Sequence, residues 1–342
     1  MINNSYRISV IRHCLIFFSL IFILSFSLRT NIAFAYQQEN TENKASEKTS
    51  ENKDETKSED QNKDNQEETA DSETSDESSQ KTTKAPRSEI DILAPVDTLT
   101  NKKADLKHYL PAEIIQPLLV GPDDHTTLVS TNNAINNKGV MILLPDWQQT
   151  AASPKALNAL RKNFPDQGWT TISVLPPNKP ANYPSIAIDN TARAEENKKI
   201  LDDYQQKLAK IIEAVTEKAK GYPGIIVVVA EGHNAALLFN IYKEELAEKP
   251  TALIIMSAHL NDDMANLTSA TNLSLLELPV LDLYLKADNY LISKSIKLRK
   301  KLVNQELKSN FRQKKIYNIR TSYYPPTSLI KEINGWLKSI GW

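Results

Sequence analysis

The chain has 342 residues, a formal net charge of −1 and a single cysteine. The charge is unevenly spread: residues 36–84 hold 15 Asp and Glu against 7 Lys, and residues 1–35 hold three Arg. Residues 85–342 are therefore mildly basic, near +4. This balance does not indicate the clustered Lys and Arg of a nucleic-acid-binding face, so no nucleic acid is expected as a partner. Because Cys14 lies in the apolar start, the rest of the chain has no disulfide, cysteine-ligated metal or cysteine nucleophile.

Residues 1–35 have the order of a secretory signal peptide. Arg7 and Arg12 precede an apolar run of about 15 residues, and Ala33-Phe34-Ala35 places small residues where a signal peptidase cuts. A spanning helix needs about 20 apolar residues, so a cleaved signal is predicted. We expect export to the periplasm or the medium. An uncleaved signal that anchors the protein in the inner membrane is the alternative.

Residues 36–87 are predicted to be a disordered acidic linker. After Tyr36 this segment contains no aromatic residue and no Val, Ile, Leu or Met. Such a composition cannot bury enough apolar surface to offset the entropy of the chain. The composition becomes globular near Ile90, and residues 88–342 are predicted to form one domain.

The domain is predicted to alternate strands with helices. The expected strands are Val140–Leu144, Thr170–Leu175, Ile225–Val229, Leu253–Met256, Val280–Leu285 and Ile316–Ile319. The expected helices are Pro154–Phe164, Thr191–Lys220, Ala235–Ala247, Ser293–Leu307 and Leu329–Ile340, with Ser153 as the N-cap of the first. Asp105–Ser130 is expected to add a helix and a leading strand near Thr126–Ser130. Because most strands are continuous apolar runs, the pattern indicates an α/β fold with a doubly wound, mostly parallel sheet.

Ligands of such sheets bind at the carboxyl ends of the strands. The polar or aromatic candidates at these ends are Asp146, Trp147, Glu231, His233, Asn234, His259 and Asp288. A phosphate-binding turn needs glycines between a strand and a helix, and neither G-x-G-x-x-G nor G-x-x-x-x-G-K-[ST] occurs. No nucleotide cofactor is therefore expected.

Several segments resemble the α/β-hydrolases. Ile225–Val229 followed by Ala230-Glu231-Gly232-His233-Asn234 is similar to their nucleophile elbow. Val140–Trp147 is similar to the strand that leads to their oxyanion loop, and Leu278–Tyr284 with Asp288 to the strand that carries their acid. The sequence is similar to an uncharacterised family of exported bacterial proteins with a degenerate form of this fold. The resemblance covers about residues 138–342.

The sequence departs from the hydrolase pattern at three points. Gly232, or Asn234 in a shifted register, stands at the nucleophile position, and neither supplies an activated hydroxyl or thiolate. Pro145-Asp146 stands where oxyanion donors are expected, and no His occurs in residues 320–328 to act as a base. Only Asp288 matches the triad pattern. No catalytic residue is assigned.

The strand-end residues allow two further interpretations. Asp146, Glu231, His233, His259 and Asp288 are the right types for a metal or acid–base cluster, but no paired spacing such as H-E-x-x-H supports one, so no metal is predicted. Trp147 and Tyr323-Tyr324 could line a ligand cleft or pack beneath a loop.

A basic stretch containing Lys297, Arg299, Lys300 and Lys301 could contact an anionic surface or envelope component. The alternative is the solvated face of a helix.

The sequence therefore favours an exported protein with a hydrolase fold that is inactive and binds or scaffolds in the cell envelope. The alternative is an active hydrolase or esterase with a non-standard site. A third hypothesis is an envelope-interaction module that works through the basic helix. Ligand, partner and pathway do not follow from the fold.

Overall fold

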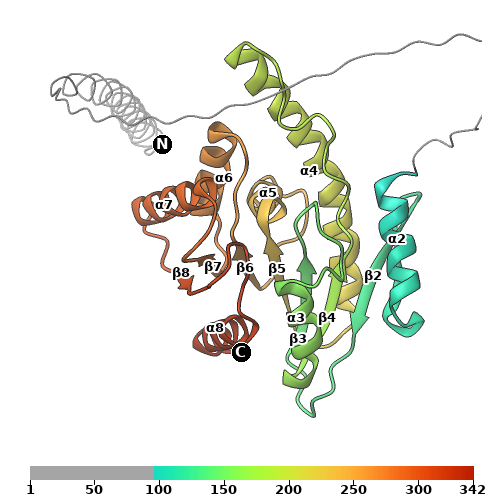
Figure 1. Ribbon diagram of the computed structural model, residues 1–342. Coiled ribbons are helices and arrows are strands. Elements are labelled where there is room, and N and C mark those ends of the chain that lie inside the picture. The colour runs from blue at the N-terminus through green and yellow to red at the C-terminus, as the bar shows by residue number, and fades with distance from the viewer. Residues whose placement is uncertain (1–95) are drawn as a thin grey trace, which may run out of the picture. The chain divides into compact units, whose positions relative to one another are not determined.

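The computed structural model describes residues 96–342 (Figure 1). The predicted signal peptide (1–35) and acidic linker (36–87) lie outside the described residues, and their boundaries stay predictions.

Eight strands form one sheet in the order β1-β2-β4-β3-β5-β6-β7-β8. The strands are β1 (Ile115–Val120), β2 (Asp123–Ser130), β3 (Gly139–Leu144), β4 (Trp169–Val174), β5 (Ile225–Glu231), β6 (Ala252–Met256), β7 (Val280–Leu285) and β8 (Phe311–Ile316). The strand β2 runs antiparallel to both of its neighbours, and all pairs from β4 to β8 are parallel. The predicted mostly parallel sheet is therefore confirmed.

Helices cover both faces of the sheet (Figure 1). One face carries α4 (Asn190–Lys220), α5 (Gly232–Lys243), α6 (Asp263–Leu275) and α7 (Tyr290–Gln305), and the other carries α3 (Ala156–Asn163) and α8 (Pro326–Ser339). The apolar run of β3 is continuous because both of its faces are buried. Ile142 packs into the core on the side of α4 and α5, and its neighbours Met141 and Leu143 pack into the core on the side of α3 and α8. The arrangement is that of the α/β-hydrolase fold.

The remaining elements are short or lie at the β1 side of the domain. They are α2 (Thr98–Tyr109) and the 3-10 helices η2 (Ala112–Ile114) and η3 (Pro165–Gln167). Leu106 of α2 packs with Leu128 and Leu175 in a small separate core.

Four predicted local features differ from the structure. The strand β1 was not expected, because Pro117 interrupts its apolar pattern; as an edge strand, β1 tolerates a proline. The last strand, β8, ends at Ile316, where the prediction placed its start. Its residues are mostly half-buried or exposed, as at a sheet edge, so they do not form an apolar run. Ser153 does not cap α3: the helix begins at Ala156 after Lys155. The fourth difference is α6, which is absent from the predicted helices and begins after Asp262 as its N-cap.

A buried ion pair joins α7 to β7. Arg299 donates from Nε and Nη2 to the two carboxylate oxygens of Asp282, at 2.9 and 3.0 Å, and from Nη1 to the carbonyl oxygen of Ala258 at 2.6 Å. Gln313 of β8 also donates to Asp282, at 2.9 Å. The pair is thus fully hydrogen-bonded, as a buried charge requires.

The prediction that Arg299 belongs to an exposed basic face is wrong, because Arg299 is only 2% exposed. Arg299 lies on the inward stripe of α7 with Ile292, Ile296 and Val303, at helical spacing. The lysines Lys297, Lys300 and Lys301 are exposed as expected.

We expect Arg299→Met to lower the free energy of unfolding by about 3–5 kcal/mol, because it leaves the Asp282 carboxylate buried without its cation. Urea denaturation measures this change. The control is Lys300→Met on the exposed face of the same helix, which should change stability by about 0.5 kcal/mol or less. Equal effects of the two substitutions would contradict a structural role for the pair.

Candidate functional site

A cavity of about 120 Å³ opens where β3, β5, β6 and β7 end. Its lining residues are Asp146, Gln149, Lys155, Glu231, Gly232, Ser257, His259, Asp288, Ile292, Ser322 and Tyr324. The structure thus brings five of the predicted strand-end residues to one cavity: Asp146, Glu231, Gly232, His259 and Asp288. Trp147, His233 and Asn234 do not line it.

The elbow is a direct transition from strand to helix. Strand β5 ends at Glu231, and α5 begins at Gly232, whose φ of +63° is left-handed. This conformation favours glycine and identifies Gly232 as the residue at the nucleophile position.

The shifted register with Asn234 at the nucleophile position does not describe the structure. Asn234 is fully buried in the first turn of α5, where it donates to the carbonyl oxygen of Pro145 at 2.7 Å. It accepts a hydrogen bond from the hydroxyl of Tyr204 at 2.9 Å. Asn234 therefore ties α5 to β3 and α4.

The Asp146 carboxylate fills the space beside Gly232. A Cβ atom added at Gly232 would lie 2.6 Å from Asp146 Oδ1 and 2.7 Å from its Cγ. The same Oδ1 accepts the backbone N–H of His233 at 2.8 Å and lies 3.0 Å from His233 Nδ1. In hydrolases with this elbow, the N–H of the residue after the nucleophile helps to bind the oxyanion. Here that donor is occupied by a carboxylate of the protein.

Aromatic rings pack behind the elbow. The Trp147 and His233 rings stack with centroids 4.0 Å apart and an interplanar angle of 19°. Trp147 also meets Tyr183 and Tyr204 edge-on, at 5.5 and 5.4 Å, and is 1% exposed. Of the two interpretations of Trp147, packing is therefore the one that the structure shows.

One ring nitrogen of His259 is taken up by a backbone carbonyl. Its Nδ1 lies 2.9 Å from the carbonyl oxygen of Ser257, and its ring is 4.4 Å from that of His233. Burial, with a contribution from nearby His233, lowers the pKa of His259 to about 4. The imidazole is therefore neutral at pH 7, and Nδ1–H donates to the carbonyl.

Ser257 was not among the candidate site residues, although its place after a strand makes it the serine that an active hydrolase with a non-standard site would use. It directly follows β6, its φ of +47° is unusual for a residue other than glycine, and Oγ donates to Asp288 Oδ2 at 2.7 Å. The hydroxyl of Tyr324 lies 2.7 Å from the same Oγ and 3.1 Å from the carbonyl oxygen of Leu283. Asp288 thus follows β7 as the resemblance implies, but its partner is a hydroxyl group. The one signal in the sequence was the place of Ser257 at a strand end.

Burial raises the pKa of two carboxyl groups that line the cavity. Glu231 is 8% exposed, and its Oε2 has no hydrogen-bond partner. Burial raises the pKa of Glu231 to about 7, against the effect of a hydrogen bond from Gln149; the negative charges of Asp146 and Asp288 add to the rise. Burial also raises the pKa of Asp288, opposed by its hydrogen bond with Ser257.

No group of three or more His, Cys, Asp or Glu side chains among residues 96–342 has the arrangement to hold a metal ion. The loop between β8 and α8, residues 317–325, contains no histidine. Tyr324 of this loop is buried at 3% exposure against Ser257, while Tyr323 is 49% exposed.

A family model described as "Protein of unknown function (DUF3530)" matches residues 19–339. The chain belongs to this family. Among curated proteins, none matches the sequence.

The chain is distantly similar to several solved structures. Dienelactone hydrolase from Anabaena variabilis is 10% identical, with 66% of this chain and 96% of that chain covered and a TM-score of 0.47. An α/β serine hydrolase homologue from Coxiella burnetii is 14% identical, with 68% and 100% covered and a TM-score of 0.42. Acyl-protein thioesterase 2 from Zea mays is 16% identical, with 62% and 97% covered and a TM-score of 0.42. Because these likenesses are distant, the fold assignment for this DUF3530 protein rests on its strand order and on the place of α5.

We expect Glu231→Gln to raise the free energy of unfolding at pH 8 by on the order of 3 kcal/mol relative to the wild type. At pH 4 the substitution should change this free energy little. A pKa raised from 4.5 to about 7 means that the folded state keeps a proton that the unfolded state loses. The Glu231 contribution to stability is therefore present below pH 4.5 and lost as the pH rises towards 7. Urea denaturation across this range measures the difference between variant and wild type.

The matched control is Glu213→Gln on the exposed face of α4. Comparing each variant with the wild type at the same pH cancels the opposite contribution of His259, whose lowered pKa costs stability as the pH falls from 6.5 towards 4. A stability difference for Glu231→Gln that does not vary with pH would refute the raised pKa.

Proposed function

We propose that this protein is a catalytically silent member of the α/β-hydrolase fold that acts by binding. The observation that carries the proposal is the Asp146 carboxylate. It lies where the side chain of a nucleophile would start and accepts the N–H that would bind an oxyanion. A tetrahedral intermediate with a negative oxygen would meet a negative charge there.

The other parts of acyl-transfer chemistry support the same proposal. Gly232 offers no nucleophile, and residues 317–325 offer no imidazole to take up a proton. Loss of the nucleophile or of the base alone costs about a millionfold in rate in subtilisin.

The cavity suits a small ligand rich in hydrogen-bond donors. Asp146, Glu231 and Asp288 supply carboxyl oxygens, and the Glu231 Oε2 atom is buried without a partner. Leaving such an atom unsatisfied costs about 1–3 kcal/mol, and a ligand that donates to it recovers that cost. A small amine or ammonium compound has the matching chemistry.

Ser257 favours a second candidate function, an esterase with a non-standard site. Its hydroxyl lines the cavity, touches the Asp288 carboxylate and sits on a strained backbone, as nucleophiles often do. The contacts favour binding over this alternative. Nδ1 of His259, the imidazole nearest in sequence, bonds the Ser257 carbonyl oxygen, and Asp288 with its raised pKa is the group on Oγ.

We expect no stoichiometric labelling of the wild-type protein by a fluorophosphonate probe and no turnover of short-chain esters. Gly232→Ser should stay inert, because its Cβ collides with Asp146 and no base faces it. Gly232→Ser combined with Asp146→Gly removes the collision and should stay inert as well. Mass spectrometry of the intact protein measures the labelling.

The companion variant is Ser257→Ala. Stoichiometric labelling of the wild type that disappears in Ser257→Ala would replace the binding proposal with the esterase.

The proposal includes export to the cell envelope, as the signal-like start indicates. Of the described residues, none belongs to a helix long and apolar enough to cross a membrane. Lys297, Lys300 and Lys301 remain exposed, and we propose that they favour contact with an anionic envelope component.

N-terminal sequencing of the protein from an envelope or periplasmic fraction should begin at Tyr36, because Ala33 and Ala35 supply the small residues of the cleavage site. Recovery of Met1 in the inner membrane would instead support the uncleaved anchor.

A further inference from the structure

A second hollow lies at the other end of the parallel strands from the strand-end cavity. It has a volume of about 460 Å³ and is lined by Glu113, Ile114, Gln116, Val129, Ser130, Thr131, Asn133, Arg161, Lys162 and Pro165. Because β2 runs antiparallel to β4, Ser130 at the end of β2 lies beside Thr171 near the start of β4. The hollow therefore opens at the amino end of β4.

The hollow holds a buried cation without a counter-ion. Arg161, in the last turn of α3, is 5% exposed. Nε and Nη2 both donate to one neutral acceptor, Asn158 Oδ1, at 3.2 and 2.9 Å. Within residues 96–342 no carboxylate forms an ion pair with Arg161, and its Nη1 makes no hydrogen bond within the protein and is open to solvent.

Arg299, the buried arginine of α7, differs from Arg161 in having a carboxylate partner. Arg299 is 2% exposed, against 5% for Arg161, and its guanidinium is shared between both oxygens of Asp282 and a backbone carbonyl. A buried charge without a partner costs several kcal/mol, so an arginine that serves only the fold is normally compensated. Burial lowers the pKa of the Arg161 guanidinium, and no neighbouring carboxylate opposes this effect.

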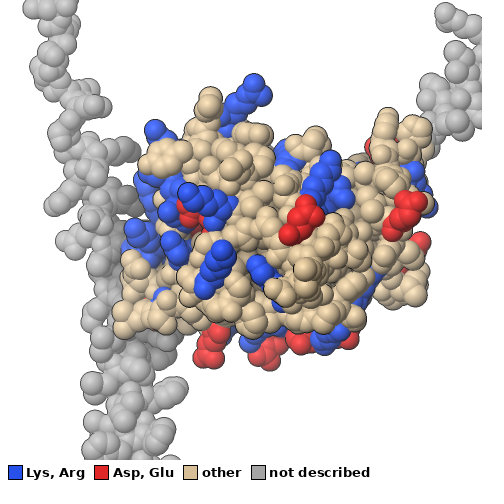
Figure 2. Space-filling view, turned by 90° about the horizontal axis from the view of Figure 1, so that it is seen from below, with Lys and Arg blue, Asp and Glu red and all other residues tan. Residues whose placement is uncertain are grey.

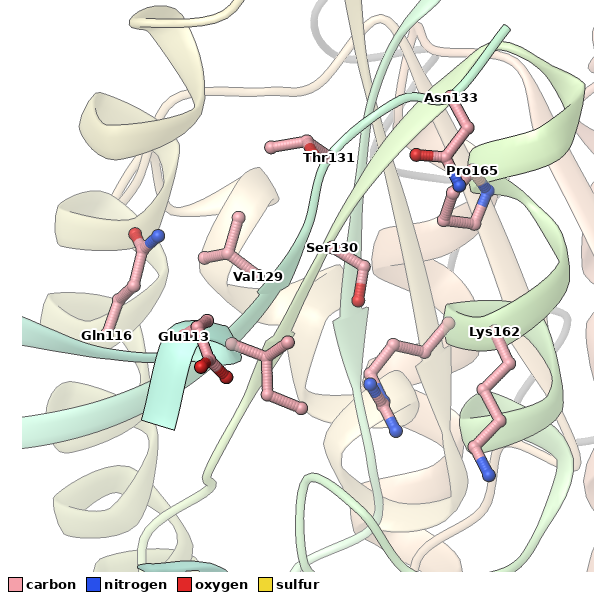
Figure 3. Close-up of a pocket in the computed structure, with 10 residues that line it drawn as sticks. Glu113, Gln116, Val129, Ser130, Thr131, Asn133, Lys162 and Pro165 are labelled. Carbon is pink, nitrogen blue, oxygen red and sulfur yellow. The ribbon is translucent and has the colours of Figure 1, made fainter. Parts of the chain in front are cut away.

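The groups around Arg161 suit an anion. Lys162 is exposed beside it, and Ser130 and Thr131 carry hydroxyl groups that can donate. Figure 3 shows Lys162 and Glu113 on opposite sides of the hollow, with Ser130 between them. Glu113 is the one carboxylate of the lining; it is exposed and forms no ion pair with Arg161.

The wider surface favours the approach of an anion. Figure 2 views the molecule from below Figure 1, the side at which β2 ends, and shows Lys and Arg spread over that face, with Asp and Glu both among them and along the lower border. Such a field raises the local concentration of anions.

We infer that the hollow at the end of β2 is a binding site for an oxyanion group, a carboxylate or phosphate, received by Arg161. The planar guanidinium pairs with two oxygens of such a group, and Lys162, Ser130 and Thr131 add charge and hydrogen bonds. The site is separate from the strand-end cavity, and it does not depend on whether that cavity is catalytic.

The test compares thermal unfolding and calorimetric titration of the full chain in chloride with the same measurements in phosphate and in acetate at equal ionic strength. Phosphate or acetate should raise the melting temperature of the wild type by a few degrees. In Arg161→Met the affinity should fall about tenfold or more and the rise should disappear. A response to phosphate but not acetate identifies a phosphate site, and the reverse identifies a carboxylate site.

Stability in chloride separates a binding role from a structural one. Without an anion, Arg161→Met should be at least as stable as the wild type, because it removes an uncompensated buried charge. Arg161→Lys keeps the charge and should keep weakened binding, whereas Lys198→Met on the exposed face of α4 should bind like the wild type. The inference is overturned if neither anion stabilises the wild type more than Arg161→Met, or if Arg161→Met and Arg161→Lys are both destabilised in chloride.

Discussion

The carboxylate of Asp146 at the first turn of α5 is the contact around which the strand-end site is arranged. A helix N-terminus presents free N–H groups and partial positive charge, and an anion there is stabilised. In this chain the anion comes from the end of β3 and bonds the N–H of His233. Because Asp146 needs the room, only a residue without a side chain fits at Gly232, and its left-handed backbone suits glycine as well. The bond also holds His233, whose ring stacks on Trp147.

The other polar groups of the site are hydroxyl and carboxyl groups, most of which are hydrogen-bonded to one another. Ser257, Tyr324 and Asp288 are joined by bonds of 2.7 Å, and Glu231 is buried where protonation is favoured. Acyl transfer requires a base poised against a nucleophile, whereas this network holds each hydroxyl against an acceptor. The unsatisfied Glu231 Oε2 is costly in the absence of a ligand, which is why we propose a recognition role for this cavity.

The two ends of the parallel strands differ in charge. Carboxyl groups gather at the carboxyl ends, and Arg161 with Lys162 lies near the amino end of β4. The buried ion pair of Asp282 and Arg299 is fully hydrogen-bonded, whereas Glu231 Oε2 and the Arg161 guanidinium, which belong to the two hollows, have no ionic partner among the described residues.

The sequence by itself determined the class of the fold and the place of the elbow. Runs such as Val140–Leu144 and Ile225–Val229 are apolar on both faces, which only a covered parallel strand requires, and the step from strand to Gly232 is local. The edge strands β1 and β8 were missed or misplaced because a half-covered strand has no continuous apolar run. The tertiary structure alone decided which strand-end groups meet and that Asp146 fills the place of a nucleophile. It also decided that Arg299 has a buried ionic partner, whereas Arg161 has none. These are contacts between residues up to about a hundred positions apart, and no local pattern encodes a distance across the sheet.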